Sequence, residues 1–497
     1  MKSYEEAKGK IDRLLKGEGL RAKVARGGAW LGSASLAEQV IRFARNMFLA
    51  RLLAPSAFGA MAIVVSSSSL VSSFTDVGVL PAIVQNPRGG DRAYLNAAWW
   101  LGIIRALFIY VVIFAASPWI ARFYGNAELS GLLRVALLST LLDGLISPRA
   151  KLAHKEMKFS RWALISNGGA ICGVILTIVL SLILRDVWAL AIGYCSENAF
   201  RCILSYIVYP GLPSFEWDRR ASRELLMFSK GMVGLSFLNL IFARADIFVL
   251  GKLYSPAMLG IYALAVNLIQ TPANFLVNTL SQTLLPALSH VQDEPERANR
   301  ILIEVTSWVI LLGLPVVVVI WLCGSSLLTV TYGARYAVAV QALAVAAAVT
   351  FFNTLNSMVT SLFFAAGRPA LHRRAVLVSA VTMMLVVYPA CKHLGIAGGQ
   401  LAALIAITAS YLLQLSRARD ITGLSMLAYC KPFVPAALLS AGILAIGMSA
   451  HLLGLGANPL ASISIAIAAC IIGCILGFPL LTRRKEMKMD ITPTTLL

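Results

Sequence analysis

The chain has 497 residues, of which 58% are hydrophobic and 13% are charged, and its mean hydropathy is +0.78. This composition excludes a soluble globular protein and indicates a chain whose solvent is the lipid bilayer. The formal net charge is +20, so the placement of the 43 Lys and Arg residues must decide between an anionic partner and membrane topology.

The first predicted element is a basic tail, residues 1–26. It carries eight Lys or Arg and four Asp or Glu without an apolar core, which argues against a cleavable signal peptide and predicts a cytoplasmic location. Ile11, Leu14 and Leu15 fall near one helical face. A short interfacial helix and a solvated tail both stay open.

Fourteen apolar stretches follow, and each is long enough to cross the bilayer as a helix of about 20 residues. We expect them near 27–50, 58–85, 95–117, 129–147, 161–184, 187–209, 224–250, 258–289, 301–323, 337–365, 374–391, 395–416, 432–452 and 457–481. Continuous apolar runs such as Leu311 to Leu322 favour helices over the alternating strands of a barrel. The sequence therefore predicts an all-α integral membrane fold of about 14 transmembrane helices.

Basic residues are concentrated on one side of this topology. The connections and tails on the side of the N-terminus hold 30 Lys and Arg, and the opposite connections hold six. Because cytoplasmic loops carry the excess of basic residues, we expect both termini in the cytoplasm of a multi-pass protein. The positive charge is then explained by topology, which favours the bilayer over nucleic acid as a partner.

The two main halves of the chain resemble each other. Pro55 and Gly59 after the first span match Pro256 and Gly260 after the seventh, at a displacement of 201 residues. Two further pairs of segments, 79–83 with 284–288 and 123–125 with 331–333, recur in the same order. This indicates two parallel six-helix repeats around a central cavity. We divide the chain into the tail, an N-lobe (27–209), a cytoplasmic linker (210–223), a C-lobe (224–416), two additional spans (417–481) and a cytoplasmic tail (482–497).

Polar residues inside spans are the candidate functional groups, because they are costly in lipid. Those of the first span recur on one helical face, and the second and eighth spans carry matching polar stripes. The candidates for cavity lining and sugar contact are Ser35, Glu38, Ser66, Ser69, Ser73, Asn267, Thr271, Asn274, Asn278 and Asn353. Hydrogen bonds that hold the helix bundle together are the alternative interpretation of these stripes.

Three arginines in spans, Arg42, Arg45 and Arg244, suit a phosphate-bearing substrate because guanidinium groups are planar and always charged. Glu38 and Arg42 lie one turn apart, so they could instead neutralise each other. The carboxylates Asp76, Asp143, Glu197, Asp246 and Glu304 are candidates for coupling to H⁺ or Na⁺. Glu197 lies one turn from Arg201, and an internal ion pair is the alternative for it.

The sequence lacks the motifs of several other classes of protein. The sequence contains no Gly-x-x-x-x-Gly-Lys-Ser/Thr phosphate loop, and no clustered His or carboxylate site for hydrolysis or glycosyl transfer. The eight cysteines fall mostly within spans without metal-ligand spacing. We therefore expect a transporter rather than an enzyme, without a metal or other cofactor.

Residues 50–59, with Asp76-Val77-Gly78 and the segment 82–85, resemble the opening of bacterial polysaccharide-biosynthesis flippases, which include O-antigen and exopolysaccharide transporters. The segments 246–252, 260–265 and 285–289 are similar to the second half of that family. The resemblance covers most of residues 27–416.

The resemblance implies the multidrug/oligosaccharidyl-lipid/polysaccharide exporter fold, with two lobes that alternate between inward-open and outward-open states. It also implies that sugar units on undecaprenyl diphosphate cross the bacterial inner membrane, where a polysaccharide polymerase would use them. Family members typically have twelve spans, and the related lipid II flippases have fourteen, so lipid II stays open as a substrate. A multidrug exporter of the same fold and a membrane scaffold of the same ancestry stay open as well.

Overall fold

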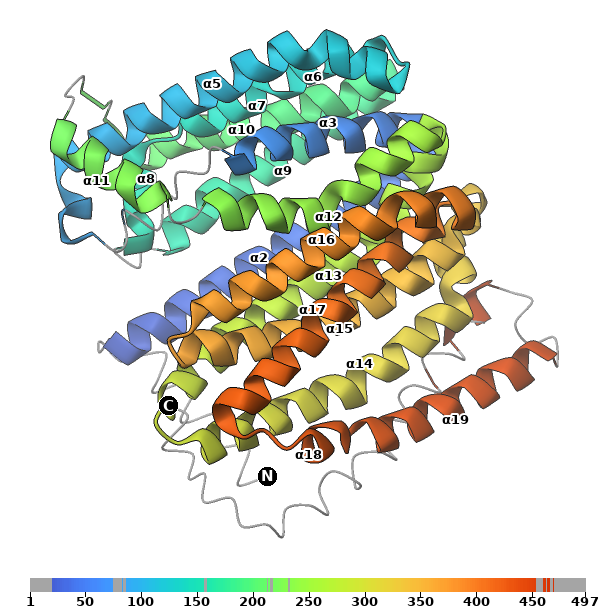
Figure 1. The fold of residues 1–497 in the computed structure, drawn as a ribbon. Coiled ribbons are helices and arrows are strands. Elements are labelled where there is room, and N and C mark those ends of the chain that lie inside the picture. The colour runs from blue at the N-terminus through green and yellow to red at the C-terminus, as the bar shows by residue number, and fades with distance from the viewer. Residues whose placement is uncertain are drawn as a thin grey trace, which may run out of the picture. The chain divides into compact units, whose positions relative to one another are not determined.

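The computed structural model describes residues 20–74, 83, 86–155, 159–211, 213–214, 218–230, 233–452, 459–461, 463–464 and 468. In these residues every regular element is a helix, in agreement with the predicted all-α class (Figure 1). The chain divides into two compact units, Met1–Leu240 and Ile241–Leu497, which are described separately.

Unit 1 is built from long apolar helices joined by short helices at their ends. Its elements are α2 (Leu20–Leu52), α3 (Pro55–Phe74), η1 (Pro87–Gly90), α5 (Arg92–Tyr124), α6 (Glu128–Ala136), α7 (Leu138–Gly144), α8 (Pro148–Lys155), α9 (Phe159–Leu184), α10 (Val187–Val208) and α11 (Arg219–Lys230). Helix α9 packs against α2 and α10, while α5 packs against α6 and α7 (Figure 1). Helix α11 lies against α5.

Unit 2 begins within α12 (Val233–Leu253). Its further elements are α13 (Pro256–Ser289), α14 (Pro295–Thr331), η2 (Ala334–Ala339), α15 (Val340–Ala365), α16 (Pro369–Leu394), α17 (Ala397–Thr422), α18 (Met426–Cys430) and α19 (Phe433–Leu452). Helices α13, α14 and α17 surround α15, and α19 packs on α14. Helix α19 corresponds to the first of the two additional spans predicted after the C-lobe.

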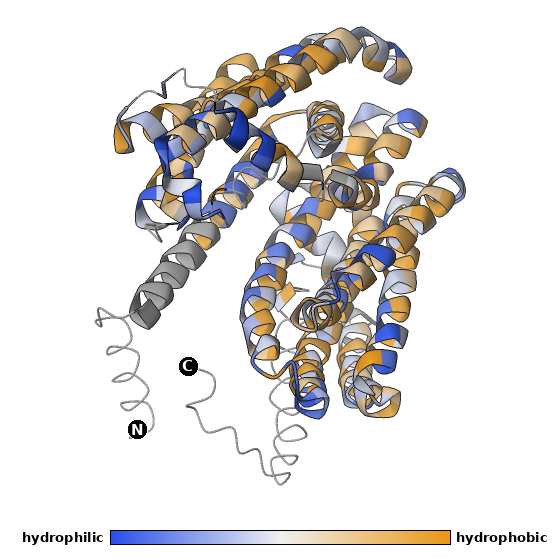
Figure 2. Cartoon of the chain, turned by 60° about the vertical axis from the view of Figure 1, so that its left-hand side comes forward, coloured by the Kyte–Doolittle hydropathy of each residue, from blue (hydrophilic) through white to orange (hydrophobic). Residues whose placement is uncertain are grey.

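Apolar residues cover most of the length of the long helices (Figure 2). Ten helical segments of the described residues are long and apolar enough to cross a membrane. Large apolar side chains such as Phe108, Ile183 and Leu385 are exposed on them, as expected where lipid replaces water. The chain is a multi-pass membrane protein.

The number of spans stays a prediction. The predicted fourth span, 129–147, consists of two short helices, α6 and α7, which meet at Leu137. Leu137 keeps right-handed helical dihedrals (φ −74°, ψ −12°), so the chain direction changes little there. Most of the last predicted span, 457–481, and most of both predicted tails lie outside the described residues.

Two landmarks of the predicted repeat lie at the ends of helices. Pro55 begins α3 and Pro256 begins α13, positions where a missing N–H costs nothing. Gly125 ends α5 with φ +66°, and Gly333 follows α14 with φ +110°, a region that favours glycine. The prolines thus begin an α-helix in both units, whereas the glycines differ, because Gly125 is left-handed before the α-helix α6 and Gly333 (ψ 160°) precedes the 3-10 helix η2.

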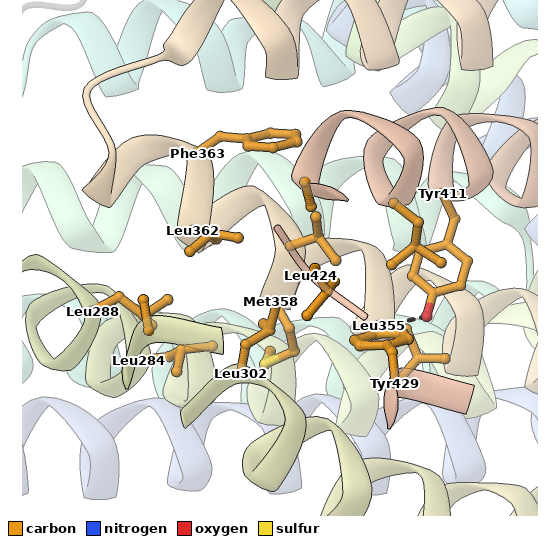
Figure 3. Close-up of a cluster of buried hydrophobic side chains, with 14 of the residues drawn as sticks. Leu284, Leu288, Leu302, Leu355, Met358, Leu362, Phe363, Tyr411, Leu424 and Tyr429 are labelled. Atoms are coloured by element: carbon orange, nitrogen blue, oxygen red, sulfur yellow. Dashed lines mark hydrogen bonds between the residues drawn. The ribbon is translucent and has the colours of Figure 1, made fainter. Parts of the chain in front are cut away.

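The core of unit 2 forms where α13, α14, α15 and α17 meet (Figure 3). Leu302, Leu355 and Met358 are fully buried there. At its edge, Tyr411 of α17 donates to the hydroxyl of Tyr429 in α18 at 2.9 Å. This contact ties the connection to α19 onto the C-lobe core.

Candidate functional site

A pocket of about 540 Å³ lies within unit 1, and every side chain that lines it is polar or charged. The lining residues are Arg42, Ser68, Ser69, Ser72, Ser73, Arg105, Ser139, Thr140, Asp143, Tyr194, Glu197, Asn198, Arg201 and Ser236. Polar walls of this size are costly in a membrane protein unless a ligand or water uses them. This pocket is the candidate functional site.

Four charged side chains form a closed ring at one wall. Arg42 and Glu38 lie one turn apart on α2, and Arg201 and Glu197 lie one turn apart on α10. Arg42 Nη2 contacts Glu38 Oε1 at 2.9 Å and also pairs with Glu197. Arg201 Nη2 contacts the Oε1 atoms of both carboxylates at 3.0 Å. Ser166 of α9 donates to Glu38 Oε2 at 3.4 Å. The ring is electrically neutral and joins α2 to α10.

Close packing of α9 on α10 holds the second half of this ring. A Cβ added at Gly173 would lie 2.7 Å from Glu197 Cα, and one at Gly169 would lie 2.9 Å from the backbone nitrogen of Arg201. The spacing Gly169-x-x-x-Gly173 thus lets the backbone of α10 approach α9. Glu197 is 5% exposed as a result.

The serines of α3 and an arginine of α5 form another wall. Arg105 Nη2 donates to the carbonyl of Ser72 at 3.1 Å, which places its guanidinium group at the pocket. Ser69 and Ser73 bond back to carbonyls of their own helix. Their hydroxyl oxygens keep acceptor capacity for a ligand.

Asp143 of α7 and Asn198 of α10 complete the pocket. In the part of the chain that the structure describes, no hydrogen bond or ion pair to the Asp143 carboxylate is found. Its side chain is exposed at the pocket. A carboxylate that lines a polar pocket without an ion pair is a candidate ligand contact or proton carrier.

The structure therefore brings together part of the predicted site. Arg42, Glu38 and Glu197 meet in the ring, so both of the ion pairs considered from sequence are formed. Ser69, Ser73 and Asp143 line the same pocket. Ser66 is fully buried, and its hydroxyl lacks a partner among the described residues.

Other predicted residues of unit 1 lie elsewhere or cannot be placed. Arg45 donates from Nη2 to Asn46 Oδ1 at 3.1 Å and is not part of the pocket lining. Asp76 and the side chain of Ser35 lie outside the described residues.

The remaining predicted residues belong to unit 2. Arg244 and Asp246 lie on α12, Asn353 on α15 and Glu304 on α14. The stripe on α13 is partly exposed, with Asn267, Asn274 and Asn278 exposed and Thr271 half-buried.

Asp246 is the most buried of these groups, at 6% exposure. It accepts a hydrogen bond from the Tyr262 hydroxyl, and Gln400 Nε2 donates to Asp246 Oδ2 at 3.2 Å. Gln400 Nε2 also lies 2.7 Å from the Tyr262 oxygen. The three side chains come from α12, α13 and α17, so this network links three helices of the C-lobe.

Sequence reasoning missed Arg105, Asn198 and the glycine pair of α9. Arg105 could have been found by the rule used for Arg42, because it interrupts an apolar span. Gly169 and Gly173 carry the spacing of a close helix contact, but the spacing alone does not say which helix they meet. Among the described residues, no group of three or more His, Cys, Asp or Glu could hold a metal ion.

Comparisons with known proteins identify the class. The model of the family described as polysaccharide biosynthesis protein matches residues 48–341, more than half of the chain. The chain belongs to this family, as its motifs indicated.

Curated relatives are similar at low identity over most of their length. An uncharacterized membrane protein in the cps region of Klebsiella pneumoniae is 22% identical over 389 residues, which cover 78% of this chain and 80% of the relative. The lipopolysaccharide biosynthesis protein WzxC of Escherichia coli (strain K12) is 22% identical over 403 residues, with 79% of each chain covered.

Solved structures establish the fold. Lipid II flippase MurJ in an inward closed conformation superposes with a TM-score of 0.76 at 13% identity, covering 91% of this chain and 99% of that one. An inward-facing multidrug resistance MATE family transporter of the MOP superfamily superposes with a TM-score of 0.59 at 14% identity, covering 79% and 99%. The expected exporter fold is thereby confirmed.

Proposed function

We propose that this chain is a flippase that moves oligosaccharide units linked to undecaprenyl diphosphate across the bacterial inner membrane. The observation that carries this proposal is the pocket of unit 1, which polar and charged residues line in a protein with an apolar exterior. The lipopolysaccharide biosynthesis role of the Escherichia coli relative and the fold shared with the lipid II flippase MurJ support it. The chain then acts as a transporter and forms no covalent intermediate.

The lining of the pocket suits a hydroxylated, negatively charged headgroup. Serine, threonine and asparagine side chains can exchange hydrogen bonds with sugar hydroxyls in either direction. Three guanidinium groups, those of Arg42, Arg105 and Arg201, offer the donor geometry that phosphate oxygens prefer. The lipid tail stays in the bilayer, because burying it in a polar pocket would lose its apolar environment.

For the diphosphate we propose Arg42, Arg45 and Arg244, as the sequence suggested, and add Arg105. Arg42 is already paired with two carboxylates, so a phosphate must replace one of these partners to bind it. The displaced carboxylate, Glu38 or Glu197, would keep Arg201 as its partner. Alternating access would expose the pocket first to the cytoplasm and then to the periplasm, with both termini cytoplasmic.

For coupling to an ion such as H⁺ we propose two carboxylates, one in each unit. Asp143 lies in the pocket without an ion pair among the described residues, and Asp246 is buried in the C-lobe network. Either could bind H⁺ in one conformation and release it in the other. Glu38 and Glu197 are poorer candidates, because each is held by two guanidinium groups.

Complementation of a polysaccharide-export mutant tests the function. The wild-type chain should restore surface glycan, and Arg45→Gln and Arg244→Gln should lower it at equal expression. Arg122→Gln is the matched control, since Arg122 is exposed on α5 outside the pocket. Restored drug resistance without surface glycan would favour a multidrug exporter, and restored peptidoglycan synthesis in a lipid II flippase mutant would favour lipid II. No rescue in any of these strains would favour the scaffold.

A further inference from the structure

Helix α11 is a short amphipathic helix between the last helix of the N-lobe and α12. The apolar segment of α12 that could cross a membrane begins at Gly234, four residues after α11 ends at Lys230. The helix therefore directly precedes a helix that could cross a membrane. Residues just before such a span lie at the level of the lipid headgroups.

One face of α11 is fixed to the N-lobe. Ala221 and Leu225 are fully buried against Tyr94 and its neighbours on α5. Arg88 of η1 contacts Asp218 at 3.2 Å and Glu224 at 3.7 Å. These contacts hold the helix in one orientation, so its opposite face is a defined surface.

The opposite face combines basic and apolar side chains. Arg219, Arg220 and Arg223 are exposed in its first half. Leu226 and Met227 follow with 48% and 64% exposure. Arg219 and Arg223 are one turn apart, so both guanidinium groups can reach a single phosphate.

Two neighbouring basic side chains of unit 1 are used internally. Arg149 donates to the carbonyl of Pro210 at 2.8 Å, and Lys155 donates to the carbonyl of Asn86 at 2.6 Å. For Arg219 and Arg223, by contrast, no hydrogen bond or ion pair joins the guanidinium group to another residue of the described chain. Arg220 contacts Glu224 at 3.3 Å while its side chain stays 80% exposed.

We propose that this face of α11 binds the headgroup of an anionic phospholipid. Arg219 and Arg223 hold the phosphate, and Leu226 and Met227 lie beside the first carbons of the acyl chains. Charge complementarity selects an anionic lipid, and exposed apolar residues next to the arginines select a lipid over a free anion. The proposal rests on the membrane setting of the fold and not on the transported substrate.

Lipid retention by the purified full chain tests this proposal. The protein in a neutral detergent is mixed with equal amounts of phosphatidylglycerol and phosphatidylcholine, passed through size exclusion, and analysed by mass spectrometry for bound lipid. The wild type should retain phosphatidylglycerol preferentially. Arg219→Gln/Arg223→Gln should retain at least threefold less, and a high salt concentration should lower retention by the wild type.

A charge-matched control uses Arg122→Gln/Arg185→Gln, which removes two exposed positive charges elsewhere in unit 1. This control should retain as much phosphatidylglycerol as the wild type. Equal retention by the α11 variant and the wild type, or an equal loss in the control, would overturn the proposal. All of these substitutions are at exposed positions, so folding should be kept and is checked by the elution profile.

A third comparison distinguishes binding of a lipid from binding of a free anion. Leu226→Gln/Met227→Gln should also lower retention, and excess inorganic phosphate should displace little lipid. Full displacement by phosphate, together with unchanged retention in this variant, would assign the surface to a free anion and contradict the lipid assignment. Failure of the flippase function would leave all three comparisons unaffected.

Discussion

Arg201 donates from Nη2 to Glu38 Oε1 at 3.0 Å, although the two residues are 163 positions apart in the chain. Through this bond α10 is joined to α2 at the wall of the polar pocket. Since Arg42 and Glu197 close the same ring, each charge is balanced by two neighbours. The ring is thus both part of the candidate site and a structural contact of the N-lobe.

A double-mutant cycle with Glu38→Gln and Arg201→Gln should show a coupling of about 1 kcal/mol, because the two groups share one network. Each single variant leaves the ring with one net charge, whereas the double variant is neutral, so each single variant should lower stability more than the double variant does. Thermal unfolding in detergent measures the effect. Additive single effects would show that the pair does not interact in solution.

Gly173→Ala should lower the stability of the N-lobe by about 1–3 kcal/mol, because the new methyl group would meet the Glu197 backbone at 2.7 Å. Transport should fall with it, since Glu197 would move away from Arg42. The matched control is Gly442→Ala on α19, where nothing lies within 4 Å of the added Cβ. That control should be neutral or slightly stabilising. Equal unfolding temperatures for the Gly173 variant and the wild type would contradict the packing described.

Tyr262→Phe should cost about 1–3 kcal/mol, because it removes the hydroxyl that donates to the buried carboxylate of Asp246. Tyr388→Phe on α16 is the control, since Tyr388 is 54% exposed and its loss should change little. Thermal unfolding of both variants compares them directly. If the two variants unfold alike, the C-lobe network contributes no stability.

The start of α11 should become less stable in acid. Asp218 accepts hydrogen bonds from the backbone of Ala221 and Arg220 and from the Arg88 side chain, and these bonds lower its pKa. Because the pKa is lower in the folded state, the stabilisation is present above about pH 4, the ordinary range of Asp, and is lost as pH falls through the folded pKa.

Hydrogen exchange of the first turn of α11, corrected for intrinsic rates, should therefore rise below about pH 4. In Asp218→Asn this additional rise should be absent, because no carboxylate titrates there. A rise of the same size in the variant would assign the acid effect to other groups.

The sequence predicted the helical class, most of the long helices and the prolines that begin α3 and α13. Pro55, Pro256, Gly125 and Gly333 carry local information, so their roles follow from residue type alone. The sequence indicated Ser69, Ser73 and Arg42 because a polar residue in an apolar span is costly, whichever way its side chain points.

Contacts between helices could not be predicted in the same way. Helical spacing placed Arg42 beside Glu38 and Glu197 beside Arg201, but it gave no information that α2 and α10 meet. Arg105 interrupts an apolar span and could have been noted, but its contact with Ser72 of α3, which is distant in sequence, could not. The pocket is a product of tertiary packing, and a pattern within one helix does not contain it.

The most direct test of the central claim is transport by the purified chain in liposomes. An oligosaccharide linked to undecaprenyl diphosphate is placed in both leaflets, and the fraction accessible to an external glycosidase is followed with time. We expect accessibility to exceed 50% only with the protein present, roughly half of the lipid being outside at the start, and Arg105→Gln to slow the crossing at least about tenfold, the equivalent of about 1.4 kcal/mol. Arg122→Gln on the same helix should cross at the wild-type rate. Accessibility equal to that of protein-free liposomes, or wild-type crossing by Arg105→Gln, would contradict the claim that the pocket of unit 1 carries the substrate.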